Sequence, residues 1–234
     1  RGGWPVDVDL DGFTDLVLFG LTPDGYVVFR SKAPSGFEPF QVSPVPKHKS
    51  NDAPPGFADF DEDGKLDIAW EEYDMKVRVM LGDGAGTFGS LATFVTGQDP
   101  RGAAAGDLTG DGHADVITIH GSTDEFSLLA GDGQGGFAFP VTLPGRSSVW
   151  GPRLGDLDGN GTLDLVARGV SKADVTVALL DGAGGVTSTA AVPVGFASDP
   201  WIELADMDGD GTLDVVTNTS NSLVVLLGDG AGTF

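Results

Sequence analysis

Nine-residue acidic segments occur five times in this chain of 234 residues. The clearest copy spans 206–214, with carboxylates at its positions 1, 3, 5 and 9 and a glycine at position 6. Carboxylates at alternating positions around a tight glycine turn can wrap oxygen ligands around one Ca²⁺. The other copies span 7–15, 59–67, 107–115 and 156–164. The spacing therefore predicts about one Ca²⁺ per copy, up to five in all.

Each predicted site uses four side chains, at positions 1, 3, 5 and 9, and the backbone carbonyl at position 7. The predicted metal ligands are Asp7, Asp9, Asp11, Phe13 and Asp15; Asp59, Asp61, Asp63, Lys65 and Asp67; Asp107, Thr109, Asp111, His113 and Asp115; Asp156, Asp158, Asn160, Thr162 and Asp164; and Asp206, Asp208, Asp210, Thr212 and Asp214. All-oxygen ligation in a flexible loop favours Ca²⁺ over Mg²⁺, which requires a tight octahedron. Thr109 and Asn160 replace an acid, so weaker binding is predicted in the third and fourth copies.

Three competing interpretations of the glycine and aspartate segments explain the pattern less well. Plain Asp/Gly turns would crowd carboxylates that repel one another without a cation. An EF-hand needs flanking helices and an acid at position 12, but Leu18, Trp70 and Thr217 stand there, inside β-rich runs. The Gly-Asp-Gly-Ala-Gly segments resemble phosphate-binding loops, but a β-rich run rather than a helix follows them.

The acidic copies begin 48 to 52 residues apart, which marks an array of repeated units. The approximate repeats are 1–52, 53–100, 101–149, 150–199 and 200–234, the last one incomplete. In each, a short apolar stretch leads into the acidic segment, and two β-rich runs and a glycine-rich turn follow. A weaker fourth run has the polar character of an edge strand. The sequence thus predicts an all-β fold, a β-propeller of four-stranded antiparallel blades.

Composition excludes several classes of partner. The formal charge is −22, and 18 of the 35 acidic residues are aspartates of the five segments. This acidity argues against nucleic acid and against anionic membrane surfaces. The chain has no cysteine, which rules out disulfides and thiolate metal sites. It has no apolar run of about 18 residues, so no membrane insertion is expected.

No catalytic or cofactor-binding residues are predicted. The histidines, His48, His113 and His120, lie in different repeats without a partner at a repeating spacing, so they are interpreted as solvated or incidental. Trp4, Trp150 and Trp201 precede acidic segments. They could stack on sugars, although packing between blades is the favoured interpretation.

The acidic segments together with turns such as Gly82-Asp-Gly-Ala-Gly-Thr-Phe88 resemble FG-GAP/VCBS repeats, as in integrin α-chain propellers and propeller lectins. The resemblance implies Ca²⁺ in the loop between the first two strands of each blade, and a ring of usually seven blades. The five repeats here are therefore expected to be part of a larger propeller or polypeptide. The turn departs from the motif at 31–37 and at Val186.

The resulting functional prediction is a non-catalytic, extracellular (secreted or cell-surface) Ca²⁺-binding propeller for adhesion, protein interaction or display. The alternative is a carbohydrate-binding lectin propeller, and a third is an accessory domain of a larger secreted enzyme or toxin. The ligand is a protein or a glycan, and the long loop 42–55 is the candidate for protein contacts. Millimolar extracellular Ca²⁺ suits the weak affinities, about 10⁻⁴–10⁻³ M, of such modules.

Overall fold

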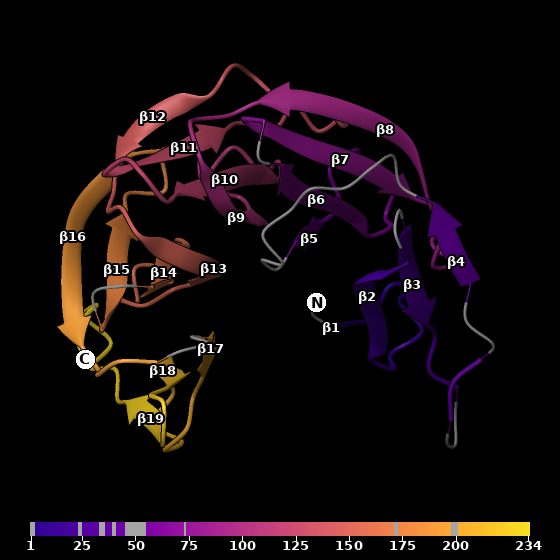
Figure 1. The fold of residues 1–234 in the computed structure, drawn as a ribbon. Helices are drawn as coiled ribbons and strands as arrows, with labels where there is room; N and C mark the ends of the chain where they lie inside the picture. Colours follow the sequence, from indigo (N-terminus) through magenta and orange to yellow (C-terminus); the bar gives the residue numbers. More distant parts are fainter. Residues whose placement is uncertain are drawn as a thin grey trace.

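The computed structural model describes residues 3–22, 25–32, 36–38, 41–44, 55–72, 74–170, 173–197 and 201–234. In these ranges the regular elements are β-strands, which form five antiparallel sheets. Figure 1 shows the sheets side by side around an arc, each running from an inner strand near the centre to an outer strand at the rim. The predicted all-β propeller architecture is confirmed.

Each sheet is one blade, and its strands follow the order of the chain. Blade one contains β1 (Gly3–Val6), β2 (Asp15–Thr22), β3 (Gly25–Phe29) and β4 (Gln41–Pro44); blade two contains β5 (Gly56–Ala58), β6 (Asp67–Glu72), β7 (Lys76–Gly82) and β8 (Phe88–Val95). Blade three contains β9 (Pro100–Gly106), β10 (Asp115–His120), β11 (Glu125–Leu129) and β12 (Val141–Pro144); blade four contains β13 (Val149–Gly155), β14 (Asp164–Gly169), β15 (Asp174–Leu180) and β16 (Val186–Pro193). The described part of blade five contains β17 (Ile202–Ala205), β18 (Asp214–Asn218) and β19 (Leu223–Leu226).

The strand patterns follow the position of each strand in its blade. Every residue of β6, β10 and β14 is buried, because these second strands are covered on both faces. The outer strand β16 is largely exposed, as its polar and small residues suggest. β8 begins at Phe88, the last residue of the predicted glycine-rich turn, because pairing continues into the turn, where Gly82 faces Phe88.

The hydrophobic core lies between the blades rather than within them. Val17 and Val28 of blade one pack with Ile68 and Trp70 of blade two. The other adjacent pairs have similar clusters, between blades two and three, three and four, and four and five. Each blade therefore buries its apolar faces against its neighbours, as expected for a repeat architecture.

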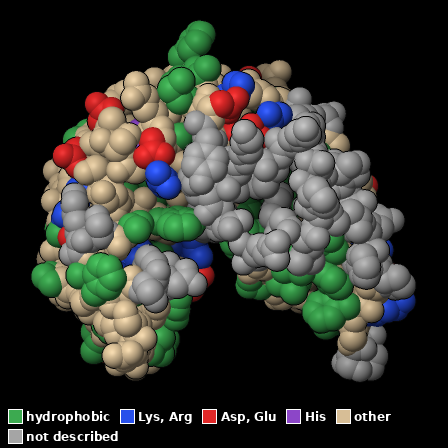
Figure 2. All heavy atoms as spheres, in the orientation of Figure 1, with side chains coloured by type: hydrophobic (Ala, Val, Ile, Leu, Met, Phe, Trp, Pro, Cys, Tyr) green, Lys and Arg blue, Asp and Glu red, His purple; other side chains and the backbone are tan. Residues whose placement is uncertain are grey.

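Blades one and five lie at the two ends of the arc (Figure 1). Figure 2 shows the notch between these ends in space-filling form. Within the described ranges, no helix is long and apolar enough to cross a membrane. Most of the candidate protein-contact loop, residues 45–54, lies outside the described ranges.

Candidate metal loops

Each acidic segment forms the connection between the first and second strands of its blade, as predicted. We call these connections loops one to five, in chain order. Position 9 of every loop is also the first residue of the second strand: Asp15, Asp67, Asp115, Asp164 and Asp214. The repeat thus places five similar acidic loops at equivalent corners of the five blades.

Hydrogen bonds within each loop set its shape. In loop two, the Asp59 carboxylate accepts from the Gly64 amide at 2.8 Å, and the Asp63 carboxylate accepts from the Lys65 amide at 3.0 Å. Gly64 has a φ of +82°, and the glycines at position 6 of the other loops have values from +84° to +92°. Only glycine adopts this backbone at low cost, so its place in the motif has a structural reason.

The aspartate at position 9 is a buried clamp. In loop two, the Asp67 side chain is fully buried; its Oδ2 accepts from the Phe60 amide and its Oδ1 from the Gly82 amide, both at 2.7 Å. It therefore ties the loop and the second strand to the end of the third strand. The same bonds join Asp15 to Val8 and Ser31, Asp115 to Leu108 and Gly131, Asp164 to Leu157 and Leu180, and Asp214 to Met207 and Gly228.

Sequence reasoning assigned this aspartate only a ligand role and missed the clamp. A partial signal was present, because position 9, like position 1, is aspartate in all five copies. Positions 3 and 5, by contrast, each tolerate one replacement, Thr109 and Asn160. A residue that accepts two buried amides has fewer substitutes than one that only donates an oxygen to an ion.

The structure brings three carboxylates together in four of the loops. In loops one, two and four the grouped aspartates are those at positions 1, 3 and 9, and in loop five those at positions 1, 3 and 5, with one oxygen of each within 4.8 Å of the others. Among the described residues, loop three forms no such group. Thr109 stands at its position 3, which accounts for the missing carboxylate.

The electrostatics of the grouped carboxylates fit a hard cation. Burial, with the nearby carboxylates of Asp15 and Asp11, raises the pKa of Asp9. One buried oxygen of Asp9 has no hydrogen-bond partner in the described structure. Burial, with smaller contributions from neighbouring aspartates, likewise raises the pKa values of Asp67 and Asp164. A divalent ion would relieve both the desolvation and the repulsion.

Loops two and three also touch each other. The His113 ring at position 7 of loop three hydrogen-bonds Glu62 at position 4 of loop two, and this contact raises the pKa of His113. Glu62 has a φ of +57°, and Leu10 at the same position of loop one has +56°. Position 4 is glycine in the other loops, also with positive φ. Sequence reasoning overlooked this second left-handed position, although its three glycines were a usable signal.

The histidine prediction needs a correction. His120 is not solvated: it is 1% exposed, and its ring nitrogens lie 3.3 Å from the hydroxyls of Thr118, Ser127 and Thr123. Burial lowers its pKa, so the neutral ring is favoured. His48 lies outside the described residues.

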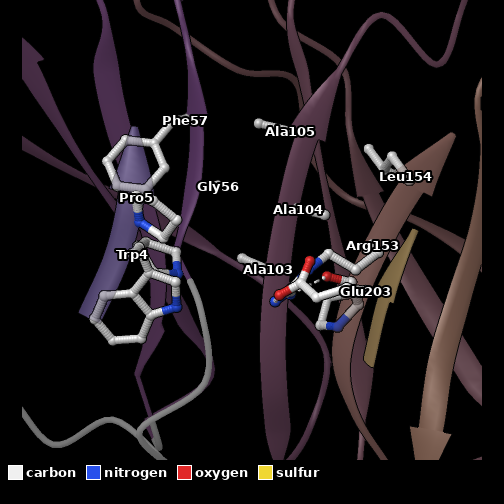
Figure 3. A pocket seen from close by; sticks show the side chains of 12 residues that line it. Trp4, Pro5, Gly56, Phe57, Ala103, Ala104, Ala105, Arg153, Leu154 and Glu203 are labelled. Atoms are coloured by element: carbon white, nitrogen blue, oxygen red, sulfur yellow. Dashed lines mark hydrogen bonds and ion pairs between the residues drawn. The ribbon is translucent and has the colours of Figure 1, made fainter. Parts of the chain in front are cut away.

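A cavity of about 330 Å³ lies among the inner strands. Figure 3 shows Trp4, Pro5 and Phe57 on one side of it and the Arg153–Glu203 pair on the other. The Arg153 guanidinium donates to both Glu203 carboxylate oxygens, at 2.9 and 2.6 Å, which joins blades four and five. Trp4 also packs against the core of blades one and two, so the favoured packing interpretation holds for this tryptophan.

A second cavity, of about 180 Å³, lies between blades three and four. Trp150, Arg101 and Val170 are among its lining residues, and Asp99 holds the Arg101 guanidinium at 2.9 Å. Trp150 is half-buried, whereas Trp201 is 43% exposed and lines neither cavity described here. The lining of this cavity combines an indole and a guanidinium, and the guanidinium is paired with a carboxylate beside it.

Comparison with known proteins agrees with the repeat and the fold. The FG-GAP-like repeat family matches residues 7–70, 59–118 and 107–167. The chain therefore belongs to the FG-GAP-like repeat family. Comparison with curated protein sequences gives no match.

Two solved structures share the fold. One is an Agrocybe aegerita lectin, described for its specific recognition of non-reducing terminal N-acetylglucosamine; it has 23% identity and a TM-score of 0.66, over 100% of this chain and 64% of that one. The other is the Photorhabdus luminescens Tc holotoxin pore, with 23% identity and a TM-score of 0.57, over 100% of this chain and 11% of that one. The chain thus spans about two thirds of the lectin and about a tenth of the toxin chain.

Proposed function

We propose that this chain is a non-catalytic, Ca²⁺-binding β-propeller that serves as an extracellular binding or display module. The observation that carries the proposal is the grouping of three aspartate carboxylates in loops one, two, four and five. Such oxygen-only donors suit Ca²⁺, which in these positions would neutralise the carboxylates and fix the hairpin between the first two strands. The role of the ion is structural.

Ligand specificity would then come from surfaces that the loops hold in place. The extracellular assignment follows from ion supply, because sites of about 10⁻⁴–10⁻³ M affinity fill in millimolar Ca²⁺ and remain empty in the cytosol. The chain spans only part of each of the two similar structures. This is consistent with a larger polypeptide that supplies further blades or a toxin scaffold.

Thermal unfolding tests this proposal. The melting temperature should fall on addition of EDTA, recover with Ca²⁺, and recover much less with Mg²⁺ at the same concentration. Asp210→Ala should weaken loop five and reduce the Ca²⁺-dependent gain in melting temperature. The matched control is Asp229→Ala, because Asp229 is exposed and lies in the glycine turn of the same blade. A melting curve that does not respond to EDTA or Ca²⁺ would refute the structural role of the ion.

The cavity between blades three and four favours carbohydrate binding as a second candidate function. An indole face can stack on the apolar face of a sugar ring, while a paired guanidinium and carboxylate exchange hydrogen bonds with its hydroxyls. Trp150 and Arg101 line the cavity of about 180 Å³, and Asp99 pairs with Arg101. The fold shared with the N-acetylglucosamine-recognising lectin supports the same candidate.

Calorimetry with N-acetylglucosamine and with a glycan ending in it, in Ca²⁺, tests the second candidate. Trp150→Ala should abolish the binding heat. Trp201→Ala, at an exposed tryptophan away from the cavity, should leave it unchanged. No binding of either probe, together with no signal on a general glycan array, would eliminate the carbohydrate function and leave the Ca²⁺ proposal intact.

A further inference from the structure

We propose that acidic loops two, three and four each position the glycine-rich turn of the following blade, so that an ion bound in one blade orders the contact with the next. This inference rests on the Ca²⁺ function proposed above. It assigns a positioning role to residues that donate no ligand oxygen: the residue at position 2 of each of these loops, and the glycine three residues after the aspartate of the turn.

The contact consists of a backbone hydrogen bond that recurs in three blade pairs. The Gly135 amide of blade three donates to the Phe60 carbonyl of loop two at 2.8 Å. The next two pairs repeat it at 3.0 Å, from Gly184 to Leu108 and from Gly232 to Leu157. In every case the acceptor is position 2 of the acidic loop of the preceding blade. Because the bond recurs in three blade pairs, it is a regular part of the interface between these blades.

The same position-2 residue is bonded to the aspartate clamp. The Phe60 amide donates to Asp67 Oδ2, while the Phe60 carbonyl accepts from Gly135. One residue therefore joins a grouped carboxylate of blade two to the turn of blade three. The side chain of Phe60 is 1% exposed and lies in the core between these blades, so the residue has little freedom to move independently.

The loop and the following turn also fit closely. A Cβ on Gly110 of loop three would lie 2.5 Å from the Gly182 carbonyl oxygen in the turn of blade four. A Cβ on Gly135 would contact Leu81 and Asp61 of blade two, at 3.4 and 3.7 Å. The glycine at position 4 of loop three thus lets the two backbones approach more closely than a side chain would allow.

The proposed ion would act on position 2 through the carboxylates at positions 1 and 3, which lie on either side of it. In loop two, Asp59 and Asp61 lie on either side of Phe60, and both are grouped with Asp67. Without a cation the three carboxylates repel one another and favour loosening of this segment. A bound Ca²⁺ would hold positions 1, 3 and 9 together, which fixes the Phe60 carbonyl and hence its bond to Gly135.

Amide hydrogen exchange, measured by NMR in the presence of Ca²⁺, tests whether a change in one loop affects the turn of the following blade. Asp61→Asn and Asp158→Asn form a matched pair, because each removes one charge at position 3 of a grouped loop, loop two or loop four. Asp61→Asn should speed exchange at Gly135 about tenfold or more and leave Gly232 unchanged, since local opening sets the exchange rate. Asp158→Asn should speed exchange at Gly232 and leave Gly135 unchanged.

Calorimetry on the same samples separates the two proposals. If the wild-type chain binds no Ca²⁺, both proposals fail. If it binds Ca²⁺ but exchange at Gly135 and Gly232 is equal in Ca²⁺ and in EDTA, the positioning role alone is overturned. Equal acceleration of both amides by Asp61→Asn would also overturn it, because that result indicates general destabilisation rather than transmission to the next blade.

Discussion

Blades two and three share one backbone plan but differ in the side chains that occupy it. Loop two has Asp61 at position 3 and groups three carboxylates, whereas loop three has Thr109 there and forms no such group. Both loops keep the buried aspartate at position 9, and both accept a hydrogen bond from the following blade. Loop three therefore keeps the clamp at position 9 and the contact with the next blade without a carboxylate at position 3, so the shape of the loop does not depend on that carboxylate.

The strongest test of this separation is at position 9. Asp67→Ala leaves two amides without their acceptor and Asp115→Ala leaves three, so each should reduce the free energy of unfolding by about 2–5 kcal/mol. Urea unfolding in EDTA measures both variants without the contribution of the ion. Asp132→Ala, at an exposed aspartate of a glycine turn, should cost far less. A much larger loss for Asp67→Ala than for Asp115→Ala would contradict the separation.

Loops two and three also differ in the residue at position 4, where the backbone φ is positive in both. Gly110 of loop three has a φ of +71° and no room for a Cβ, so Gly110→Ala should destabilise the chain by about 1–3 kcal/mol. Glu62 already holds the corresponding left-handed backbone in loop two, so Glu62→Ala should cost less. Urea unfolding in EDTA compares the two variants. Equal losses would show that loop three does not depend on its glycine.

A substitution at position 3 should give loop three the carboxylate that loop two has and raise its affinity for Ca²⁺. Thr109→Asp restores the missing carboxylate, and one added ligand charge should tighten Ca²⁺ binding in loop three about tenfold, which equals about 1.4 kcal/mol. Thr109→Asn is the control, because it adds an oxygen without charge. Isothermal titration calorimetry with Ca²⁺ reports the change. If Thr109→Asp and Thr109→Asn bind alike, carboxylate number is not what separates the loops.

The two blades also differ at the last residue of the second strand, where blade two has Glu72 paired with Arg78 and blade three has His120. Burial lowers the pKa of folded His120, although Glu125 and Asp99 oppose this shift. Below pH about 6.5 the unfolded chain therefore binds a proton that the folded chain binds less readily. The free energy of unfolding consequently decreases as the pH is lowered through this range. Between pH 7.5 and 5.5 the loss from this residue is at most about 1.4 kcal/mol.

His120→Gln should remove that component of the pH dependence. Urea unfolding of the wild type and of His120→Gln at both pH values gives the difference, and other titrating groups cancel in the comparison. A wild-type chain that loses no more stability than the variant would contradict the neutral, buried state of His120.

Much of the architecture is predictable because it depends on local spacing. The period of about 50 residues, the β-rich runs and the glycine turns predict the strand order, and the alternating aspartates predict which connection carries the acidic loop. The positive φ of Gly64 follows from its place in the motif. These features need only neighbours in sequence.

Features that depend on three-dimensional contacts, between blades or between strands of one blade, escaped prediction. The bond from Gly135 to Phe60 joins residues 75 positions apart, and no spacing within one repeat indicates it. His120 was interpreted as solvated or incidental because it has no partner at a repeating spacing, yet its ring lies next to the hydroxyls of Thr118, Thr123 and Ser127. The clamp at position 9 was hidden by its second role, since a carboxylate suits both an ion and two amides.

The central claim is that the acidic loops hold Ca²⁺ and that the number of grouped carboxylates sets how well they do so. Native mass spectrometry of the chain titrated with Ca²⁺ tests this most directly, by counting bound ions. The account predicts that four ions bind first, one for each loop with a carboxylate group, with loop four the weakest of these because Asn160 lacks a charge. A fifth ion should bind only at higher Ca²⁺ and be lost on Thr109→Ala. A chain that carries no Ca²⁺ at millimolar concentration, or that fills loop three as readily as loop two, would contradict it.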